Sequence, residues 1–187
     1  DWRNCRVIFI RAFAELASTM LFLNALAQMP LANVTAILQS LPLTVTMFAA
    51  MFFGEAVGWR RWSAILVGFI GVLIIIRPGS DGFNEYAVLA LIAVGFITLR
   101  DAITRRLDRS VPSLFVAFVS AIPVFLFGGA MTATTGWTPV SWSMGIIVTV
   151  AAISITCGYL FAVMAMRIGD VSFVAPFRYT GMIWAIL

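Results

Sequence analysis

The stretch LASTMLFLNALAQMPLANVTAILQSLPLTVTMFAAMFFG, residues 16–54, contains no charged side chain in 39 positions. A single helix of this length would be roughly 58 Å long at about 1.5 Å per residue, close to twice the ~30 Å thickness of a bilayer core. Gln28, Met29 and Pro30 interrupt the apolar sequence near its middle, as a turn would. The stretch therefore predicts two antiparallel membrane spans, at about residues 7–28 and 31–53.

The same pattern continues through the rest of the chain. Residues 110–166 are also uncharged, and a turn-forming segment at 134–139 divides them into expected spans at 111–133 and 143–166. Shorter spans are expected at 62–76 and 86–104, and a seventh begins at Val171 and continues to the end of the sequence. We thus predict an all-α polytopic membrane protein with about seven spans in this sequence.

The composition agrees with a chain that lies in lipid. Hydrophobic residues make up 62% of it and charged residues 11%, with a mean hydropathy of +1.04, whereas soluble domains carry about 25% charged residues. Histidine is absent, and Cys5 and Cys157 are too far apart to suggest a metal site or a disulfide framework. We therefore expect no cofactor and no metal, and we do not expect an enzyme.

The positive charge comes from arginine alone, and it indicates the orientation of the chain. With seven spans, eight arginines fall in the loops on the side of the N-terminus and only Arg77 falls on the other side. The positive-inside rule then makes the N-terminal side cytoplasmic and predicts a multi-pass protein of the inner (plasma) membrane, with the lipid bilayer and not nucleic acid as its partner. The eight are Arg3, Arg6, Arg60, Arg61, Arg105, Arg106, Arg109 and Arg167.

A weak internal repeat points to a class of architecture. A shift of 140 residues places Ala25, Leu31 and Val34 over Ala165, Val171 and Val174, each set around a turn between two helices. The two helix pairs start from opposite sides of the membrane in the predicted topology. Inverted repeats of this kind are used by many secondary transporters to alternate access to a midplane site.

Several motifs resemble those of a known family. The run ALAQMPLANVTA at 25–36, Leu41-Pro42, the run FFGE at 52–55 and residues 68–78 resemble the first half of an EamA-like drug/metabolite transporter, and residues 159–176 resemble part of its second half. The resemblance implies an inverted-repeat bundle of ten helices. It further implies that residues 1–77 hold three spans of the first repeat and residues 78–187 hold four spans of a truncated second repeat.

Charged residues inside predicted spans mark the first candidate site, because each costs ~2.5–3.5 kcal/mol at a helix centre. Glu15 lies about 12 Å and Arg178 about 10 Å from the cytoplasmic ends of their spans, at about 1.5 Å per residue. We hypothesise that both face one cavity and serve a substrate or a coupling proton. The alternatives are a structural ion pair between them, or pairing of Glu15 with Arg11 one helical turn earlier.

Three further residues are weaker candidates for the substrate or proton site. Arg100 lies only about 6–8 Å deep, so it is expected either to reach the membrane interface or to line the inner mouth of a cavity. Gln39 and Ser40 lie near the bilayer middle beside Pro42, where a loosened helix can present backbone carbonyls. Packing between helices is an equally good explanation for these two polar side chains.

The function favoured by these features is secondary transport of a small polar metabolite across the cytoplasmic membrane by alternating access, with Glu15 as the candidate proton carrier. A flippase for a lipid-linked sugar would share the fold class, and an intramembrane enzyme is the less favoured alternative. The sequence specifies neither the substrate, nor the direction of transport, nor the coupling ion, nor the oligomeric state.

Overall fold

The computed structural model describes residues 2–55, 57–76, 85–108, 110–137, 139–168, 171–174 and 177. All regular secondary structure in these residues is helical, so the predicted all-α class is confirmed. The helices, in chain order, are α1 (Trp2–Gln28), α2 (Leu31–Leu38), α3 (Leu41–Phe53), α4 (Trp59–Ile76), α5 (Glu85–Thr104), α6 (Ser113–Thr135), α7 (Trp142–Ile168) and α8 (Val171–Val174).

Five segments of the described residues are long and apolar enough to cross a membrane. They are Asn4–Gln28, Asn33–Phe53, Glu85–Thr104, Ser113–Thr135 and Trp142–Ile168. The prediction of a polytopic membrane protein is thereby confirmed. Helix α4, with 18 residues, coincides with the span expected at 62–76, whereas most of the span expected from Val171 onward lies outside the described residues.

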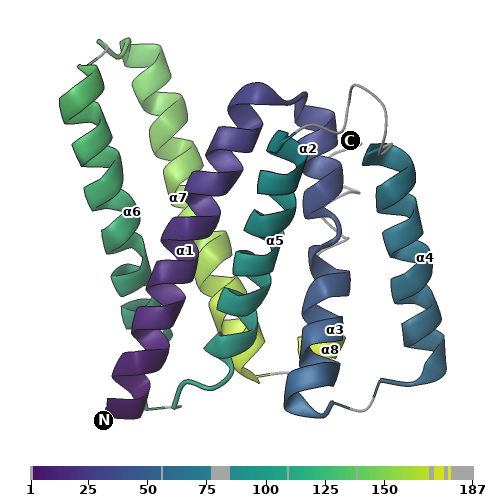
Figure 1. Cartoon of the computed structure of the whole chain (residues 1–187). Coiled ribbons are helices and arrows are strands. Elements are labelled where there is room, and N and C mark those ends of the chain that lie inside the picture. The colour runs from purple at the N-terminus through teal and green to yellow at the C-terminus, as the bar shows by residue number, and fades with distance from the viewer. Residues whose placement is uncertain are drawn as a thin grey trace.

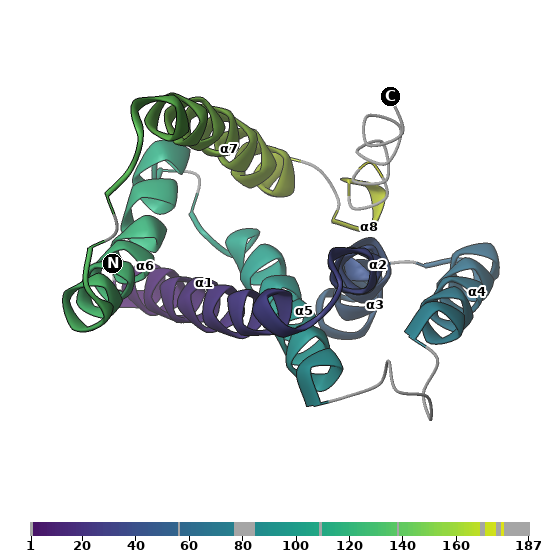
Figure 2. The same ribbon diagram turned by 90° about the horizontal axis from the view of Figure 1, so that it is seen from above.

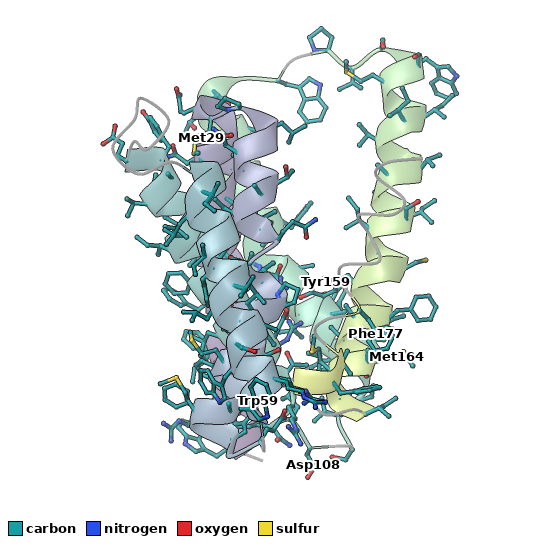
Figure 3. All side chains as sticks on the ribbon, turned by 90° about the vertical axis from the view of Figure 1, so that its right-hand side faces the viewer. Met29, Trp59, Asp108, Tyr159, Met164 and Phe177 are labelled. Atoms are coloured by element: carbon teal, nitrogen blue, oxygen red, sulfur yellow. The ribbon has the colours of Figure 1, made fainter. Side chains whose placement is uncertain are left out.

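The long helices alternate in direction, so their connections gather at two ends of the molecule (Figure 1). The N-terminus, the C-terminal end of α7 and the α3–α4 and α5–α6 connections lie at one end. Figure 3 places Asp108, in the α5–α6 connection, at the opposite end from Met29, at the α1–α2 turn. The end with the N-terminus is the one to which the loop arginines were assigned, so the arrangement agrees with the predicted topology.

Helices α1 and α5 meet near the middle of the molecule, with the α6–α7 hairpin on one side and α4 on the other (Figure 2). Small side chains permit this close approach. Ala87, Ala90 and Ala93 of α5 and Ala25 of α1 are at most 1% exposed, and small residues at helix interfaces let backbones pack closely in membranes. Ala25, Ala87 and Ala90 belong to a cluster that also includes Val34 of α2 and reaches Val72 of α4.

The second predicted span is interrupted between α2 and α3. Gln39 and Ser40 form a turn there, although both keep a right-handed helical backbone. Pro42 has no N–H and so cannot donate to the carbonyl of Leu38 one turn earlier, which is how proline loosens a helix. The span continues in the same direction across this break, as Figure 1 shows.

Apolar side chains cover the outer faces of the α6–α7 hairpin. Leu126 of α6 is 63% exposed, and Ile147 and Phe161 of α7 are 66% and 68% exposed. In water such a surface would aggregate, but in a bilayer it is the surface that faces lipid. Tryptophans at the helix ends, including Trp59 and Trp142, are also exposed, as expected of an interfacial aromatic belt.

Candidate functional site

Two charged residues on α1 form the base of the site. Arg11 and Glu15 are four residues apart, so they share one face of the helix. Arg11 is 1% exposed. Its Nε donates to Thr104 Oγ1 of α5 at 2.8 Å, one terminal nitrogen donates to Ser120 Oγ of α6, and the other donates to the hydroxyl of Tyr159 of α7 at 2.9 Å. Arg11 thus connects three other helices to α1.

Glu15 pairs with a cation from α5. One terminal nitrogen of Arg100 lies 3.0 Å from Oε1 and 3.1 Å from Oε2 of Glu15. The hydroxyl of Tyr159 donates a further hydrogen bond of 2.6 Å to Oε2. Each side chain of this ion pair is 14% exposed. A buried carboxylate with three polar contacts is well compensated for the loss of water.

Arg100 also holds the neighbouring acid on α5. Its Nε and its second terminal nitrogen lie 2.9 Å and 2.8 Å from Oδ1 of Asp101. The side chain of Asp101 is 7% exposed. Arg11, Arg100, Glu15 and Asp101 therefore make a cluster of two positive and two negative side chains, which we call the charge network. Its formal charge is zero, and this lowers the cost of placing it within a membrane.

Tyr159 is the residue at which the charge network meets α7. Its hydroxyl accepts from Arg11 and donates to Glu15. The guanidinium carbons of Arg11 and Arg100 lie 5.4 Å and 5.7 Å from the centre of its ring, within the range of cation–π attraction. Figure 3 shows Tyr159 between α7 and the rest of the bundle. The tyrosine is therefore the contact through which α7 reaches both arginines.

A cavity of about 550 Å³ lies beside the charge network, between α1, α6 and α7. This volume lies within the ~300–1,000 Å³ typical of small-molecule sites. Its polar lining is Glu15, Thr19, Thr156 and Tyr159, and the remaining lining is apolar and includes two phenylalanine rings. Among the described residues that line the cavity, Glu15 alone is charged.

The structure brings two of the sequence-predicted site residues together. Glu15 and Arg100, which were chosen separately, form one ion pair. The Arg100 side chain is thus directed to Glu15 and Asp101 and is 14% exposed. Arg178 lies outside the described residues, so its proposed pairing with Glu15 stays a prediction. The alternative pairing of Glu15 with Arg11 is replaced by the contacts of Arg11 with Thr104, Ser120 and Tyr159.

Gln39 and Ser40 lie at the break between α2 and α3, apart from the charge network. Ser40 is 1% exposed, and its hydroxyl donates to the carbonyl of Ile37 at 2.6 Å. Gln39 is partly exposed. The described contacts of Ser40 are those of a packing residue, and neither residue lines the cavity beside Glu15.

Sequence reasoning did not select Tyr159, Thr104 or Ser120, and it considered Arg11 only as a partner for Glu15. A signal for Tyr159 was available, since it is the only tyrosine in α7 and a buried phenol requires a hydrogen-bond partner. Thr104 and Ser120 carry no such signal. Both donate to carbonyls of their own helices, as threonine and serine in membrane helices often do. The hydrogen bonds that they accept from Arg11 come from another helix and are seen only in the structure.

Other polar contacts stabilise the end of the bundle that holds the N-terminus. Arg105, after α5, forms an ion pair with Glu55, after α3, and lies over the ring of Phe53. Arg167, near the end of α7, donates to the carbonyls of Asp108 and Val111, each at 2.7 Å. Within the described residues there is no group of three or more histidine, cysteine or acidic side chains that could hold a metal ion.

The chain is similar to several transporters of known name. It is 26% identical to the S-adenosylmethionine uptake transporter of Rickettsia conorii over 84% of the chain and 53% of that protein. It is 28% identical to the riboflavin transporter of Vibrio cholerae over 91% of the chain and 57% of that protein. It is 24% identical to the pseudopaline exporter of Pseudomonas aeruginosa over 95% of the chain and 63% of that protein.

The chain spans about half the length of the first two of these curated relatives. No solved structure gives a significant match to it. Residues 1–77 match the model of the EamA-like transporter family, and the motifs at 25–36 and 52–55 lie within the matched segment. Family model, relatives and membrane spans agree with the resemblance found in the sequence: the chain is a multi-pass membrane protein whose residues 1–77 match the EamA-like transporter family.

Proposed function

We propose that the protein that contains this chain is a secondary transporter of a small polar metabolite. The observation that carries the proposal is the charge network beside an open cavity within the membrane-spanning helices. Four charged side chains at this depth are costly even when paired, and ionisable residues inside membranes usually mark a substrate or ion pathway. The names of the relatives include both uptake and export, so they support a metabolite as cargo and favour no direction.

The mechanism that we propose is alternating access between two inverted repeats, residues 1–77 and 78–187 with the helices that complete them. In this scheme Glu15 and Arg11 belong to the first repeat, whereas Arg100 and Tyr159 belong to the second. The hydrogen bonds between them then cross the repeat interface. A contact of this kind can break and reform as one repeat moves against the other.

Glu15 is the proposed coupling residue. It lines the cavity and also holds Arg100 and Tyr159, so its protonation would weaken the contacts that join α1 to α5 and α7. Binding of a proton or of cargo at Glu15 would then favour a different arrangement of these helices. This linkage of one carboxylate to two repeats is what a coupled transporter requires.

The test is metabolite profiling of vesicles that contain the full-length protein, with and without a protonophore, by mass spectrometry. We expect one class of small polar metabolites to be enriched and the enrichment to collapse with the protonophore. Glu15→Gln should abolish accumulation against a gradient, while Glu85→Gln, the same change at an exposed position on α5, should not.

Two results would count against the proposal. Unchanged accumulation and unchanged protonophore sensitivity in a folded Glu15→Gln protein would exclude coupling through this residue. A lack of enrichment for any metabolite, combined with translocation of a lipid-linked sugar across the same vesicles, would replace metabolite transport with the flippase alternative.

A further inference from the structure

The hydrogen-bonding groups that line the cavity beside Glu15 share one property. The hydroxyl of Thr19 donates to the carbonyl of Glu15 at 2.8 Å, and that of Thr156 donates to the carbonyl of Ala152 at 2.7 Å. The hydroxyl of Tyr159 donates to Glu15 Oε2 at 2.6 Å. Because a hydroxyl carries only one hydrogen, all three offer only lone pairs to a molecule in the cavity.

The fourth polar group, the Glu15 carboxylate, is an acceptor by nature. The polar lining of the cavity therefore consists of acceptors and provides no free hydrogen-bond donor among the described side chains. A carboxylate or phosphate placed here would meet lone pairs and a negative charge. It would lose its hydration without gaining hydrogen bonds.

The arginines do not change this conclusion, because their donors are directed elsewhere. Arg11 donates to Thr104, Ser120 and Tyr159, and Arg100 donates to Glu15 and Asp101. Neither arginine lines the cavity. An anionic cargo would have to displace Glu15 or Tyr159 to reach a guanidinium group.

The remainder of the lining is apolar and sets the other half of the specificity. Phe118 and Phe125 of α6 and Ile155 of α7 line the cavity together with further aliphatic side chains. Two aromatic rings favour a flat apolar body, and they also attract a cation over their faces. A molecule that fits this cavity would therefore be amphipathic, with one end at the polar side chains and the other against the apolar ones.

We infer that this cavity binds an organic cation of the amine type, with its ammonium group at Glu15, Thr156 and Tyr159 and an apolar, preferably aromatic, body against α6. This inference rests on the proposed transport function and specifies the class of cargo for the same site. An ammonium group brings three donors and a positive charge to a lining of acceptors. It would compete with Arg100 for Glu15, and in this way cargo binding would be linked to the charge network.

The experiment uses two probes of similar size and opposite charge, 2-phenylethylammonium and 3-phenylpropanoate, with the full-length protein in detergent and in proteoliposomes. Equilibrium binding is measured by calorimetry, and flux is measured separately with radiolabelled probes. We expect the ammonium probe to bind at least tenfold more tightly than the carboxylate probe. Glu15→Gln should weaken ammonium binding by about tenfold or more, because a charged hydrogen-bond partner is lost.

A pair of variants on α7 keeps the test independent of the ion pairs. Thr156 and Thr149 are both exposed and both donate to the carbonyl four residues earlier, but only Thr156 lines the cavity. Thr156→Val should weaken ammonium binding by about threefold through loss of one acceptor, while Thr149→Val should leave it unchanged. Both variants are expected to fold, since valine is nearly isosteric with threonine and both side chains are exposed.

The inference is overturned if the carboxylate probe binds as tightly as the ammonium probe, if neither binds, or if ammonium binding is equal in the two threonine variants. Flux distinguishes this failure from failure of the proposed function. Accumulation of other metabolites without a preference for the ammonium probe would leave transport intact and remove the inference. Ammonium binding that depends on Thr156 but produces no flux would uphold the site and count against transport.

Discussion

Replacement of Tyr159 by phenylalanine would test the charge network with the smallest change that affects it. The variant keeps the ring and removes one oxygen. Two hydrogen bonds are lost, the one donated to Glu15 at 2.6 Å and the one accepted from Arg11 at 2.9 Å. Glu15 keeps its ion pair with Arg100, and Arg11 keeps its hydrogen bonds to Thr104 and Ser120, so neither charged side chain loses all its hydrogen-bond partners.

The expected cost follows from the type of bond. Hydrogen bonds between membrane helices contribute about 0.6 kcal/mol on average, whereas bonds to charged groups contribute about 1.5–3 kcal/mol in soluble proteins. Two bonds of intermediate strength give a loss of about 2 kcal/mol in the free energy of unfolding. That loss corresponds to a roughly 30-fold shift in the unfolding equilibrium.

The measurement is reversible denaturant unfolding of the full-length protein in detergent micelles. Tyr86→Phe is the matched control, because Tyr86 is a partly buried tyrosine on α5 that packs against the apolar cluster and lies outside the charge network. We expect the control to change stability by less than about 0.5 kcal/mol. Equal stabilities of the two variants would show that the Tyr159 hydroxyl contributes nothing, and the described network would then be wrong.

Three further predictions concern helix packing and the polar contacts of Glu55 and Arg167. Alanine at Gly68 would place its Cβ against Cδ1 of Leu43, whereas alanine at Gly71 would meet no described atom within 4 Å. In thermal unfolding, Gly68→Ala should therefore destabilise the protein by about 1 kcal/mol, and Gly71→Ala should stabilise it by about 0.5 kcal/mol. A Gly68→Ala protein more stable than the Gly71→Ala protein would contradict the α3–α4 packing. Glu55→Gln removes the ion pair with Arg105 and should cost about 1 kcal/mol relative to Glu85→Gln in the same assay, so equal stabilities would show that this pair contributes nothing. Arg167→Gln should accelerate hydrogen exchange in the 110–116 segment by about tenfold, because Val111 and Ser113 lose the guanidinium that holds them; exchange unchanged from that of Arg60→Gln on the exposed face of α4 would refute it.

Most of the fold could be predicted from the sequence because a helix needs about 20 consecutive, mainly apolar residues to cross a bilayer. The expected spans at 31–53 and 86–104 coincide with α2–α3 and α5 within one residue at their ends. The end of α1 at Gln28 was marked by Pro30. The span expected at 7–28 lies within α1, which begins at Trp2, and the segment that could cross a membrane begins at Asn4.

The site was harder to predict, because a pattern along one helix does not identify its partner on another. Counting residues from the span ends placed Glu15 and Arg178 at similar depths and Arg100 nearer the surface. The structure nevertheless pairs Glu15 with Arg100. The two counted depths differ by only about 4–6 Å, which a long arginine side chain can cover, so sequence distance alone did not identify this pair. The match in depth between Glu15 and Arg178 stays a prediction.

The zero formal charge of the network has an electrical consequence. Moving one elementary charge through the membrane potential requires about 2.3 kcal/mol per 100 mV. Because Arg11, Arg100, Glu15 and Asp101 cancel one another, their joint displacement in an empty carrier would do almost no work against that potential. The network itself would then add little to the voltage dependence of a transport cycle.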